Sequence, residues 1–473
     1  MAKRELPRVH FYDQDLVDMY EKSWQWVTDF WKKGTEENGL QSRFFSHPDS
    51  DRISQFEACF SVFWLVYCNR IFPVMSLIDN FYAKQEPSGA IRGEYRLKDG
   101  KPILSDKNPE GIHPPLFAWA ENALYHRLGS KKRVRDVLPI LERYHQWLED
   151  SYRCKNGLYS VPLAATMMEN APRRAMAYPV DFNAQQAANA LYMSALGDLI
   201  NDKDVCYRYK RAFFSLKTRI NALMWNKQDG FYYDLDKNEQ QIPVKTVASL
   251  WTLLAEIPNE DRAQRLIGHL TDPKEFGIDN PFPTLAASEE GYDRLGQGYQ
   301  GSVFPPFNYM IIKGLEKYGR HDLARDSAIR HLYYVLDGLH PEDNSNGSLW
   351  EAYAPQHEGP ARWRGKKGFP RQLFLPYAGL STIALMIENV VGLSISLPRK
   401  TVEWTIPTLE SMGIEALGLK RNVITILSNK SSRGWEIRLE SEKLYYLTID
   451  VIGVKKKTLP IPSGKCSLLI DKL

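Results

Sequence analysis

Two carboxylates in aromatic or apolar surroundings are the residues of this 473-residue sequence best suited to chemistry. Glu351 lies between Trp350 and Tyr353, and Glu169 follows a pair of methionines and precedes a pair of arginines. A charged side chain among aromatic rings is costly unless it is paired or takes part in a reaction. Two separated carboxylates suit glycoside hydrolysis, in which one protonates the leaving oxygen and the other activates water or attacks the sugar.

Structural roles for the same residues remain open at this point. Glu169 can form an ion pair with the arginines that follow it and so order its loop, and for Glu351 the functional and the structural interpretation are equally open. Asp181 stands where a helix begins, which favours an N-cap role. Further candidates are Phe56 and Glu57 at the start of a predicted helix and Arg92 and Glu94 in a loop. Trp119 and Glu121 lie together on one predicted helix.

Several other kinds of function are not indicated. The sequence contains no glycine-rich nucleotide motif, no H-E-x-x-H zinc motif and no G-x-S-x-G nucleophile motif. Its ten histidines are dispersed and form no cluster with metal-ligand spacing, so we expect no metal site. Glycoside hydrolysis by two carboxylates requires no cofactor, and none is expected. A net charge of +4 on so long a chain offers no electrostatic footprint for nucleic acid. A small-molecule partner is therefore expected, and the sequence makes no prediction of oligomeric state.

The cysteines and the chain start indicate a cellular location. Five scattered cysteines form neither a zinc pattern nor a disulfide framework, which is typical of a reducing compartment. The first residues lack the apolar core of a signal peptide. No run approaches the roughly 18–20 apolar residues that a membrane-spanning helix needs. We therefore expect a cytoplasmic protein without a membrane contact.

The apolar periodicity divides the chain into two parts. From about residue 14 to residue 392, apolar residues recur at steps of three and four, which predicts amphipathic helices over 16–33, 54–83, 114–128, 134–150, 203–225 and further segments. After residue 394 the period becomes two, which predicts strands. We therefore expect a helical domain over 1–394, with long loops between its helices, and a small antiparallel β-domain over 395–473.

Six stretches resemble, in the same order, the motifs of a group of inverting glycosidases that fold as an (α/α)6 barrel. This group comprises the trehalase-like enzymes and glycoside hydrolase family 63, and it includes mannosylglycerate hydrolases. The resemblance spans roughly residues 53–392. The six stretches are Gln55-Phe56-Glu57, Phe72-Pro73 through Gln85, Pro114 to Glu121, Met168 to Arg173, Gly301 to Tyr309, and Trp350 to Pro355.

This resemblance implies a mainly α fold, an (α/α)6 toroid of six helical hairpins, and inverting hydrolysis of an α-glucoside or a related small sugar conjugate. It implies that Glu169 is the general acid and Glu351 the general base, and that Phe56 and Glu57 lie in the −1 subsite. The sequence departs from the family pattern at three positions, because glutamate replaces aspartate at 57 and 169 and phenylalanine replaces tryptophan at 56. The sugar-binding set expected with them is Arg92, Glu94, Trp119, Glu121, Asn170, Arg173, Asp181, Gln185, Tyr309 and Trp350.

Two alternatives to a hydrolase are weighed against this interpretation. The departures at positions 57 and 169 favour a carbohydrate-binding protein that has kept a glycosidase fold without turnover. A lyase or an epimerase on the same toroid requires histidines beside the matching motifs, and the histidines of this sequence are not placed there. The β-domain offers no carboxylate pattern and is expected to pack on the toroid as a structural cap.

Overall fold

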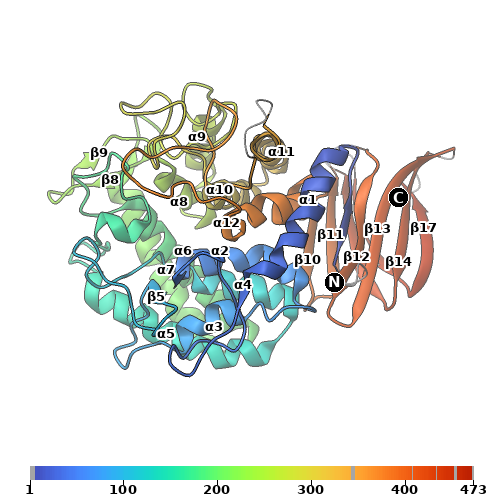
Figure 1. Cartoon of the computed structure of the whole chain (residues 1–473), viewed down its shortest axis with the longest axis horizontal. Coiled ribbons are helices and arrows are strands. Elements are labelled where there is room, and N and C mark those ends of the chain that lie inside the picture. The colour runs from blue at the N-terminus through green and yellow to red at the C-terminus, as the bar shows by residue number, and fades with distance from the viewer. Residues whose placement is uncertain (1–5, 342–346, 407–408, 433, 452–454, 471–473) are drawn as a thin grey trace.

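The structure, a computed structural model, describes residues 6–341, 347–406, 409–432, 434–451 and 455–470. A large helical body lies beside a smaller β-domain (Figure 1). The α-helices are α1 (Gln14–Trp26), α2 (Gln55–Leu65), α3 (Ser76–Tyr82), α4 (Phe117–Leu128), α5 (Lys131–Tyr152), α6 (Val180–Leu199), α7 (Lys203–Leu223), α8 (Trp251–Leu254), α9 (Glu260–Thr271), α10 (Pro305–Lys317), α11 (His321–Leu339) and α12 (Leu375–Gly379). The 3₁₀ segments are η1 (Val27–Phe30), η2 (Val66–Cys68), η3 (Leu163–Thr166) and η4 (Val247–Leu250), and η5 (Leu380–Val390) continues α12 as a π-helix.

Six of these elements form a closed inner ring. Helix α2 contacts α4, α4 contacts α6, α6 contacts α8, α8 contacts α10, α10 contacts η5, and η5 contacts α2 again. Other long helices pack outside this ring against an inner neighbour, as α7 does on α6 and α11 does on α10. The helical body is therefore the expected (α/α)6 toroid, and the prediction of a mainly α fold is confirmed.

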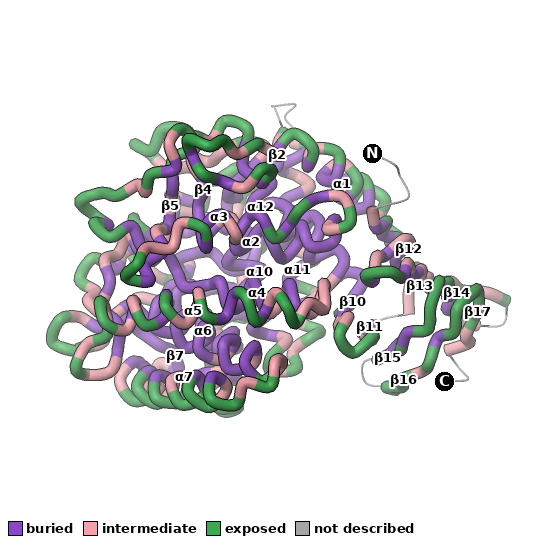
Figure 2. The backbone as a smooth tube through the Cα atoms, turned by 90° about the horizontal axis from the view of Figure 1, so that it is seen from below, coloured by how far each residue is buried: buried purple, intermediate pink, exposed green. Residues whose placement is uncertain are grey.

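Helices of the inner ring and helices packed outside it differ in how much of their surface is apolar. Helix α6 is buried on nearly every side, including polar residues such as Asn183 and Gln186, because other helices surround it. Outer helices such as α5 bury a single stripe, which runs through Val134, Leu138 and Leu141, and present charged residues to solvent. Figure 2 shows this distribution, with buried backbone in the centre of the toroid and exposed backbone along its rim.

The described residues of the β-domain form two sheets. One has the strand order β1 (Arg8–His10), β12 (Met412–Leu419), β13 (Asn422–Ser431), β14 (Gly434–Ser441) and β17 (Gly464–Leu469), and the other has the order β10 (Leu393–Ser396), β11 (Thr401–Ile406), β15 (Tyr445–Val451) and β16 (Lys455–Ile461). Burial alternates along β11 and β13, as the period of two predicted. Fully buried Trp404 in β11 donates its indole N–H to the carbonyl of Val391 at 2.7 Å, which ties the β-domain to the end of η5.

Two features of the β-domain differ from the expectation. Strands β11 and β15 run parallel, with Val402 opposite Leu447, so the second sheet is mixed rather than purely antiparallel. Strand β1 pairs with β12 through Val9 and Ile414, so residues near the start of the chain also belong to this domain. Neither feature has a periodic signal, because β1 is only three residues long and strand direction follows from how the strands are connected.

Several predicted helices are shorter than their apolar patterns. The segment 54–83 is divided into α2, η2 and α3, because the chain turns over residues 69–75, where Pro73 cannot continue a helix. The segment 16–33 ends as a helix at Phe30, because Trp31 pairs in a two-stranded ribbon. Within the described residues, the loops carry four such ribbons. They are formed by β2 (Trp31–Lys32) with β3 (Phe44–Phe45), β4 (Arg52–Ser54) with β5 (Glu94–Arg96), β6 (Trp225–Asn226) with β7 (Phe231–Tyr232), and β8 (Asp234–Leu235) with β9 (Gln241–Ile242).

Candidate active site

Glu351 and Glu57 meet at one arginine, at the end of the toroid where the inner helices begin. Glu57 lies in the first turn of α2, and Glu351 and Arg371 lie in the loop between α11 and α12. Arg371 donates from Nη2 to Oε1 of Glu351 at 2.8 Å and to Oε1 of Glu57 at 2.9 Å, and from Nε to Oε2 of Glu351 at 3.0 Å. The structure therefore brings together two carboxylates that are far apart in the sequence.

The backbone of the same loop fixes Glu351. Its N–H donates to the carbonyl of Arg371 at 3.0 Å, and the N–H of Arg371 donates to Oε2 of Glu351 at 3.1 Å. The guanidinium of Arg371 also stacks on the ring of Phe374, 3.6 Å from its centroid. Glu351 is therefore held in one orientation by its own loop, at 9% exposure.

Burial and charge act in opposite directions on the second carboxylate. Burial raises the pKa of Glu57, the positive charge and hydrogen bond of Arg371 oppose this, and the negative charge of Glu351 adds to the increase. The net effect is a raised pKa. Arg371 therefore compensates only part of the cost of placing two negative charges together in a buried site.

Glu169 belongs to the same group of charges. It is an exposed residue in the loop that follows η3, two residues after Met167, which has a φ of 63°. Burial raises the pKa values of Tyr299 and Tyr377 well above 10.0, and the charges of both Glu169 and Glu351 raise them further. The two buried tyrosines therefore lie within the electrostatic range of both predicted catalytic residues.

Asn170 connects the Glu169 loop to the loop before α10. Its Nδ2 donates to the carbonyl of Gln297 at 2.8 Å, and its Oδ1 accepts from the N–H of Tyr299 at 2.7 Å. Gly298 stands between these partners with a φ of +57°, and a Cβ at that position would lie 2.7 Å from the ring of Trp363. Asn170 thus positions its neighbour Glu169 through the backbone of a second loop.

An aromatic cluster lies next to these carboxylates. Phe56 is buried and packs on Tyr377 at a centroid distance of 6.1 Å and on Phe307 at 6.3 Å. Tyr299 contacts Phe307 at 6.4 Å and Trp363 at 5.7 Å. The rings come from α2, α10, α12 and two loops, so several parts of the toroid define one site.

Arg173, Asp181 and Asp234 form a separate buried cluster. The guanidinium of Arg173 forms two hydrogen bonds with each aspartate, at 2.8 and 2.8 Å to Asp181 and at 2.6 and 2.7 Å to Asp234. Asp181 is the second residue of α6 rather than its N-cap, which is Pro179. These hydrogen bonds fix the start of α6 against the chain that follows the Glu169 loop. Gln185, one turn further along α6, is also buried.

Other members of the expected sugar-binding set have protein partners of their own. Arg92 pairs with Glu86 at 2.7 Å and with Glu110, and Glu94 pairs with Arg52 at 3.0 Å. The negative charge of Glu94 contributes to raising the pKa of Glu57, so Glu94 lies at the edge of the site.

Four further members of that set have their contacts elsewhere in the toroid. Glu121 is bound by Arg133 and Tyr82 toward the outer helices, at 2.7 and 2.9 Å. Trp350 donates its indole N–H to the carbonyl of Gly338. Trp119 and Tyr309 line a cavity that faces the β-domain.

Five residues of this region were not predicted from the sequence, namely Arg371, Tyr299, Tyr377, His47 and Trp363. Arg371 ends the basic segment 362–371, and a signal for it was available, because a buried Glu351 requires a cationic partner. His47 hydrogen-bonds to the carbonyl of Gln372 at 3.1 Å, and burial, together with the charge of Arg371, lowers its pKa. The tyrosines gave no signal, because buried tyrosines are common in helical cores.

Metal-binding and membrane-spanning features are absent from the part of the chain that the structure describes. Among those residues, no three His, Cys, Asp or Glu side chains are grouped as metal ligands. No helix within the same ranges is long and apolar enough to cross a membrane.

Solved structures with the same fold include several glycosidases. The mannosylglycerate hydrolase of Thermus thermophilus in complex with glucose superposes with a TM-score of 0.59 and 17% identity, over 78% of this chain and 98% of the other. The neutral trehalase Nth1 of Saccharomyces cerevisiae superposes with a TM-score of 0.55 and 12% identity, over 75% and 76% of the chains. At these identities the likeness concerns the fold.

Sequence comparisons extend this likeness. An uncharacterized protein of Borreliella burgdorferi is 49% identical over the full length of both chains. Residues 392–473 match the family described as trehalase, C-terminal domain, which corresponds to the β-domain. Residues 78–369, more than half of the chain, match the family described as mannosylglycerate hydrolase MGH1-like glycoside hydrolase domain. The chain therefore belongs to the MGH1-like glycoside hydrolases, a trehalase-like group of toroid proteins.

Proposed function

We propose that this protein hydrolyses the glycosidic bond of an α-glucoside or a related small sugar conjugate, with inversion at the anomeric carbon. Glu169 would act as the general acid and Glu351 as the general base. The observation that carries this proposal is the contact between the Glu169 loop and the site of Glu351. Asn170, next to Glu169, accepts the N–H of Tyr299, and the ring of Tyr299 packs on Phe307. Phe307 in turn packs on Phe56, next to the Glu57 that shares Arg371 with Glu351. A single sugar ring can be reached from both sides only if the acid and the base border one pocket.

The hydrogen bonds of Glu351 are compatible with the role of a base. A carboxylate has about four lone-pair positions. Oε2 of Glu351 accepts two N–H groups of Arg371, whereas Oε1 accepts one. The second lone pair of Oε1 can therefore take a proton from a water molecule. Arg371 meanwhile holds the carboxylate in place through charge-assisted hydrogen bonds from Nε and Nη2.

The acid is supported by a different environment. Glu169 is exposed toward the loops, whereas Glu351 is buried beside an arginine. A proton donor must reach a leaving group that arrives from solvent, and the exposure of Glu169 suits this role. Glu57 and the Phe56 ring would contact the sugar itself, with Glu57 accepting hydrogen bonds from its hydroxyl groups.

Basic residues next to Trp363 favour a leaving group with negative charge. Arg364, Lys366 and Lys367 are exposed, and Lys366 lies 4.1 Å from the centroid of the Trp363 ring. A structure of the Thermus thermophilus mannosylglycerate hydrolase holds D-glycerate, a carboxylate. We propose that the corresponding subsite of this protein, between Trp363 and the basic residues, receives a carboxylate-bearing leaving group.

Glu351→Gln tests the mechanism. We expect loss of turnover with retained sugar affinity, because glutamine keeps the shape of the side chain but cannot accept a proton. Exposed Glu358 lies in the same loop, so Glu358→Gln is the matched control and should retain full activity. Proton NMR of the first-formed product from mannosyl- and glucosylglycerate reports the anomer. Turnover by Glu351→Gln, or a product with retained configuration, would contradict the assignment.

A second candidate function is carbohydrate binding without turnover. It is favoured by the hydrogen bonds that occupy most of the Glu351 carboxylate and by the charge that Arg371 shares with Glu57. Calorimetry on the wild-type protein separates the two functions. Binding of an α-linked substrate without product release over hours would support the binding function, and product release would exclude it.

A further inference from the structure

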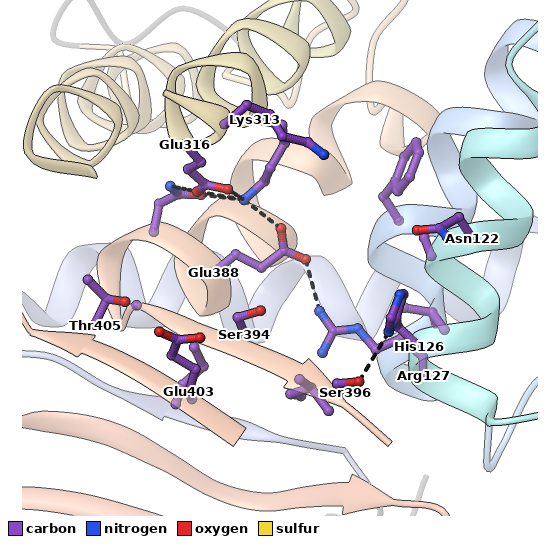
Figure 3. Close-up of a pocket in the computed structure, with 18 of the residues that line it drawn as sticks. Asn122, His126, Arg127, Lys313, Glu316, Glu388, Ser394, Ser396, Glu403 and Thr405 are labelled. Carbon is purple, nitrogen blue, oxygen red and sulfur yellow. Dashed lines mark hydrogen bonds and ion pairs between the residues drawn. The ribbon is translucent and has the colours of Figure 1, made fainter. Parts of the chain in front are cut away.

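A cavity of about 580 Å³ lies at the opposite end of the toroid from Glu57 and Glu351. Inner helices contribute their C-terminal halves to it, and strands β10 and β11 form its other wall (Figure 3). Helix α4 supplies Asn122, His126 and Arg127, and α10 supplies Lys313 and Glu316. Its volume is within the range of small-molecule sites, about 300–1,000 Å³. This space is therefore large enough for a ligand and separate from the candidate active site.

One buried carboxylate in the cavity wall is fully matched by protein groups. Glu388 binds Lys313 at 2.9 Å and Arg127 at 3.3 Å, and it accepts the hydroxyl groups of Tyr67 and Tyr309 at 2.8 and 3.0 Å. Burial raises the pKa of Glu388, but the charges of Lys313 and Arg127 outweigh it and lower the pKa overall. Glu388 is therefore ionised and its charge is compensated, so it does not call for a cationic ligand.

The guanidinium of Arg127 that pairs with Glu388 has one donor atom left over. The Nη1 atom of Arg127 is buried and has no hydrogen-bond partner among the described residues. Arg399 is exposed and lines the cavity. Burial lowers the pKa of His126, and the positive charges of Arg399 and Arg127 lower it further, so Arg399 lies close to this histidine. A buried guanidinium N–H without an acceptor costs free energy that a ligand oxygen would recover.

Hydroxyl groups of strand β10 face this positive region. Figure 3 shows the guanidinium of Arg127 directed toward the space between Ser394 and Ser396. The Oγ atom of Ser396 is 3.2 Å from Nδ1 of His126, and Ser394 is exposed to the cavity. Cationic and hydroxyl donors that converge from a helix and a strand suit a tetrahedral oxyanion, which accepts hydrogen bonds in several directions.

We propose that this cavity is a second binding site, for a small hydroxylated molecule that bears a phosphate group. The phosphate would lie between Arg127, Arg399 and the hydroxyl groups of Ser394 and Ser396. The hydroxylated part would extend along Asn122 and Thr405, since the cavity is far larger than a phosphate ion alone requires. This site does not depend on hydrolytic activity, and none of its residues belongs to the proposed catalytic group.

Titration calorimetry with glucose 6-phosphate, inorganic phosphate and glucose tests the proposal. Wild-type protein should bind glucose 6-phosphate with a Kd below about 1 mM. Arg399→Glu and Ser394→Glu, both at exposed positions, should each weaken this binding at least tenfold by adding negative charge. Exposed Arg421, between β12 and β13 and outside the cavity, provides the matched control, and Arg421→Glu should leave the affinity unchanged. Hydrolytic activity should be the same in all of these variants.

A second measurement locates the ligand independently of the variants. Binding of a phosphate dianion should raise the pKa of His126, which can be followed by its NMR resonance in wild-type protein. Absence of glucose 6-phosphate binding, or equal binding by both cavity variants with no shift at His126, would overturn the proposal. Equal affinity for inorganic phosphate and glucose 6-phosphate would assign the site to the free ion and overturn a sugar-sized ligand.

Discussion

Glu351 and Arg371 are joined by four hydrogen bonds, two through the backbone of their loop and two confined to the side chains. The carboxylate proposed to activate water is therefore positioned by the loop that carries it rather than by the helices of the toroid. Arg371 also connects this loop to the first turn of α2 through Glu57. Arg371 is thus a positioning residue for both carboxylates.

Replacement of Arg371 should reduce the rate and shift its pH dependence. Arg371→Met removes the charge that opposes the raised pKa of Glu57. Glu57 is proposed to accept hydrogen bonds from the sugar in its ionised form, so the acidic limb of the pH–rate profile should move to higher pH. Loss of the fixed geometry should lower kcat by about 10²-fold. Arg371→Lys keeps the charge but not the planar fork, so it should lower kcat with a smaller shift of the profile. An unchanged acidic limb in Arg371→Met would show that Arg371 has only a structural role.

Glu57 should make the stability of the protein depend on pH. Its folded-state pKa is raised above the ordinary value of 4.5, so the stability that it contributes is fully present below that value and is lost as pH rises through the folded-state pKa. The wild type should therefore lose stability relative to Glu57→Gln as pH rises from 4.5 toward neutral. Melting temperatures of both proteins across this window measure the difference. Exposed Glu358→Gln should show no such trend, and a difference that grows in the opposite direction would contradict the sign.

Gly298→Ala should affect activity more than the backbone strain alone explains. A Cβ at position 298 would lie 2.7 Å from Trp363 and 2.8 Å from Oδ1 of Asn170, the residue next to Glu169. Gly319 has a similar φ, +68° against +57°, but open space around it, so Gly319→Ala is the matched control. We expect both variants to lose about 1 kcal/mol or more in unfolding free energy, whereas only Gly298→Ala should lose kcat. Equal kcat in both variants would exclude a coupling between this turn and Glu169.

Arg173 should be important for stability. Arg173→Met leaves Asp181 and Asp234 buried without their counter-ion, which should lower the free energy of unfolding by about 3–5 kcal/mol. Arg174 is exposed, so Arg174→Met should change it by less than about 0.5 kcal/mol. Chemical denaturation measures both. An Arg173→Met protein that is as stable as the wild type but binds sugar more weakly would contradict this structural role. It would show that Arg173 binds the sugar.

The toroid could be predicted because helical periodicity survives wherever one face of a helix meets solvent. The outer helices α5 and α7 show this. The inner helices α6 and α10 were also predicted from apolar residues at steps of three and four. Boundaries were predicted less well, since the apolar residues of 54–83 continue through the turn at Pro73 that separates α2 from α3. The change to period two at residue 394 located the β-domain within a few residues of β10.

A residue of the candidate site could be predicted where its sequence neighbours already indicate an unusual environment. Glu351 is such a residue, because aromatic residues flank it in the sequence. Arg371 acquires its role only when the loop folds back on Glu351. Trp119 and Tyr309 lie in motif stretches, but the rotation of α4 and α10 turns both toward the cavity beside the β-domain. Side-chain direction around a buried helix cannot be read from apolar periodicity, because all of its faces are apolar.

The pairing of β1 with β12 joins two distant parts of the chain in a single sheet. During synthesis on the ribosome, β1 is made early. It cannot pair with β12 until about four hundred more residues have been added. The whole toroid is made between the two halves of this ladder. Closure of the sheet is thus a late event, and a truncation that removes Arg8 to His10 would leave the edge of β12 open to another molecule.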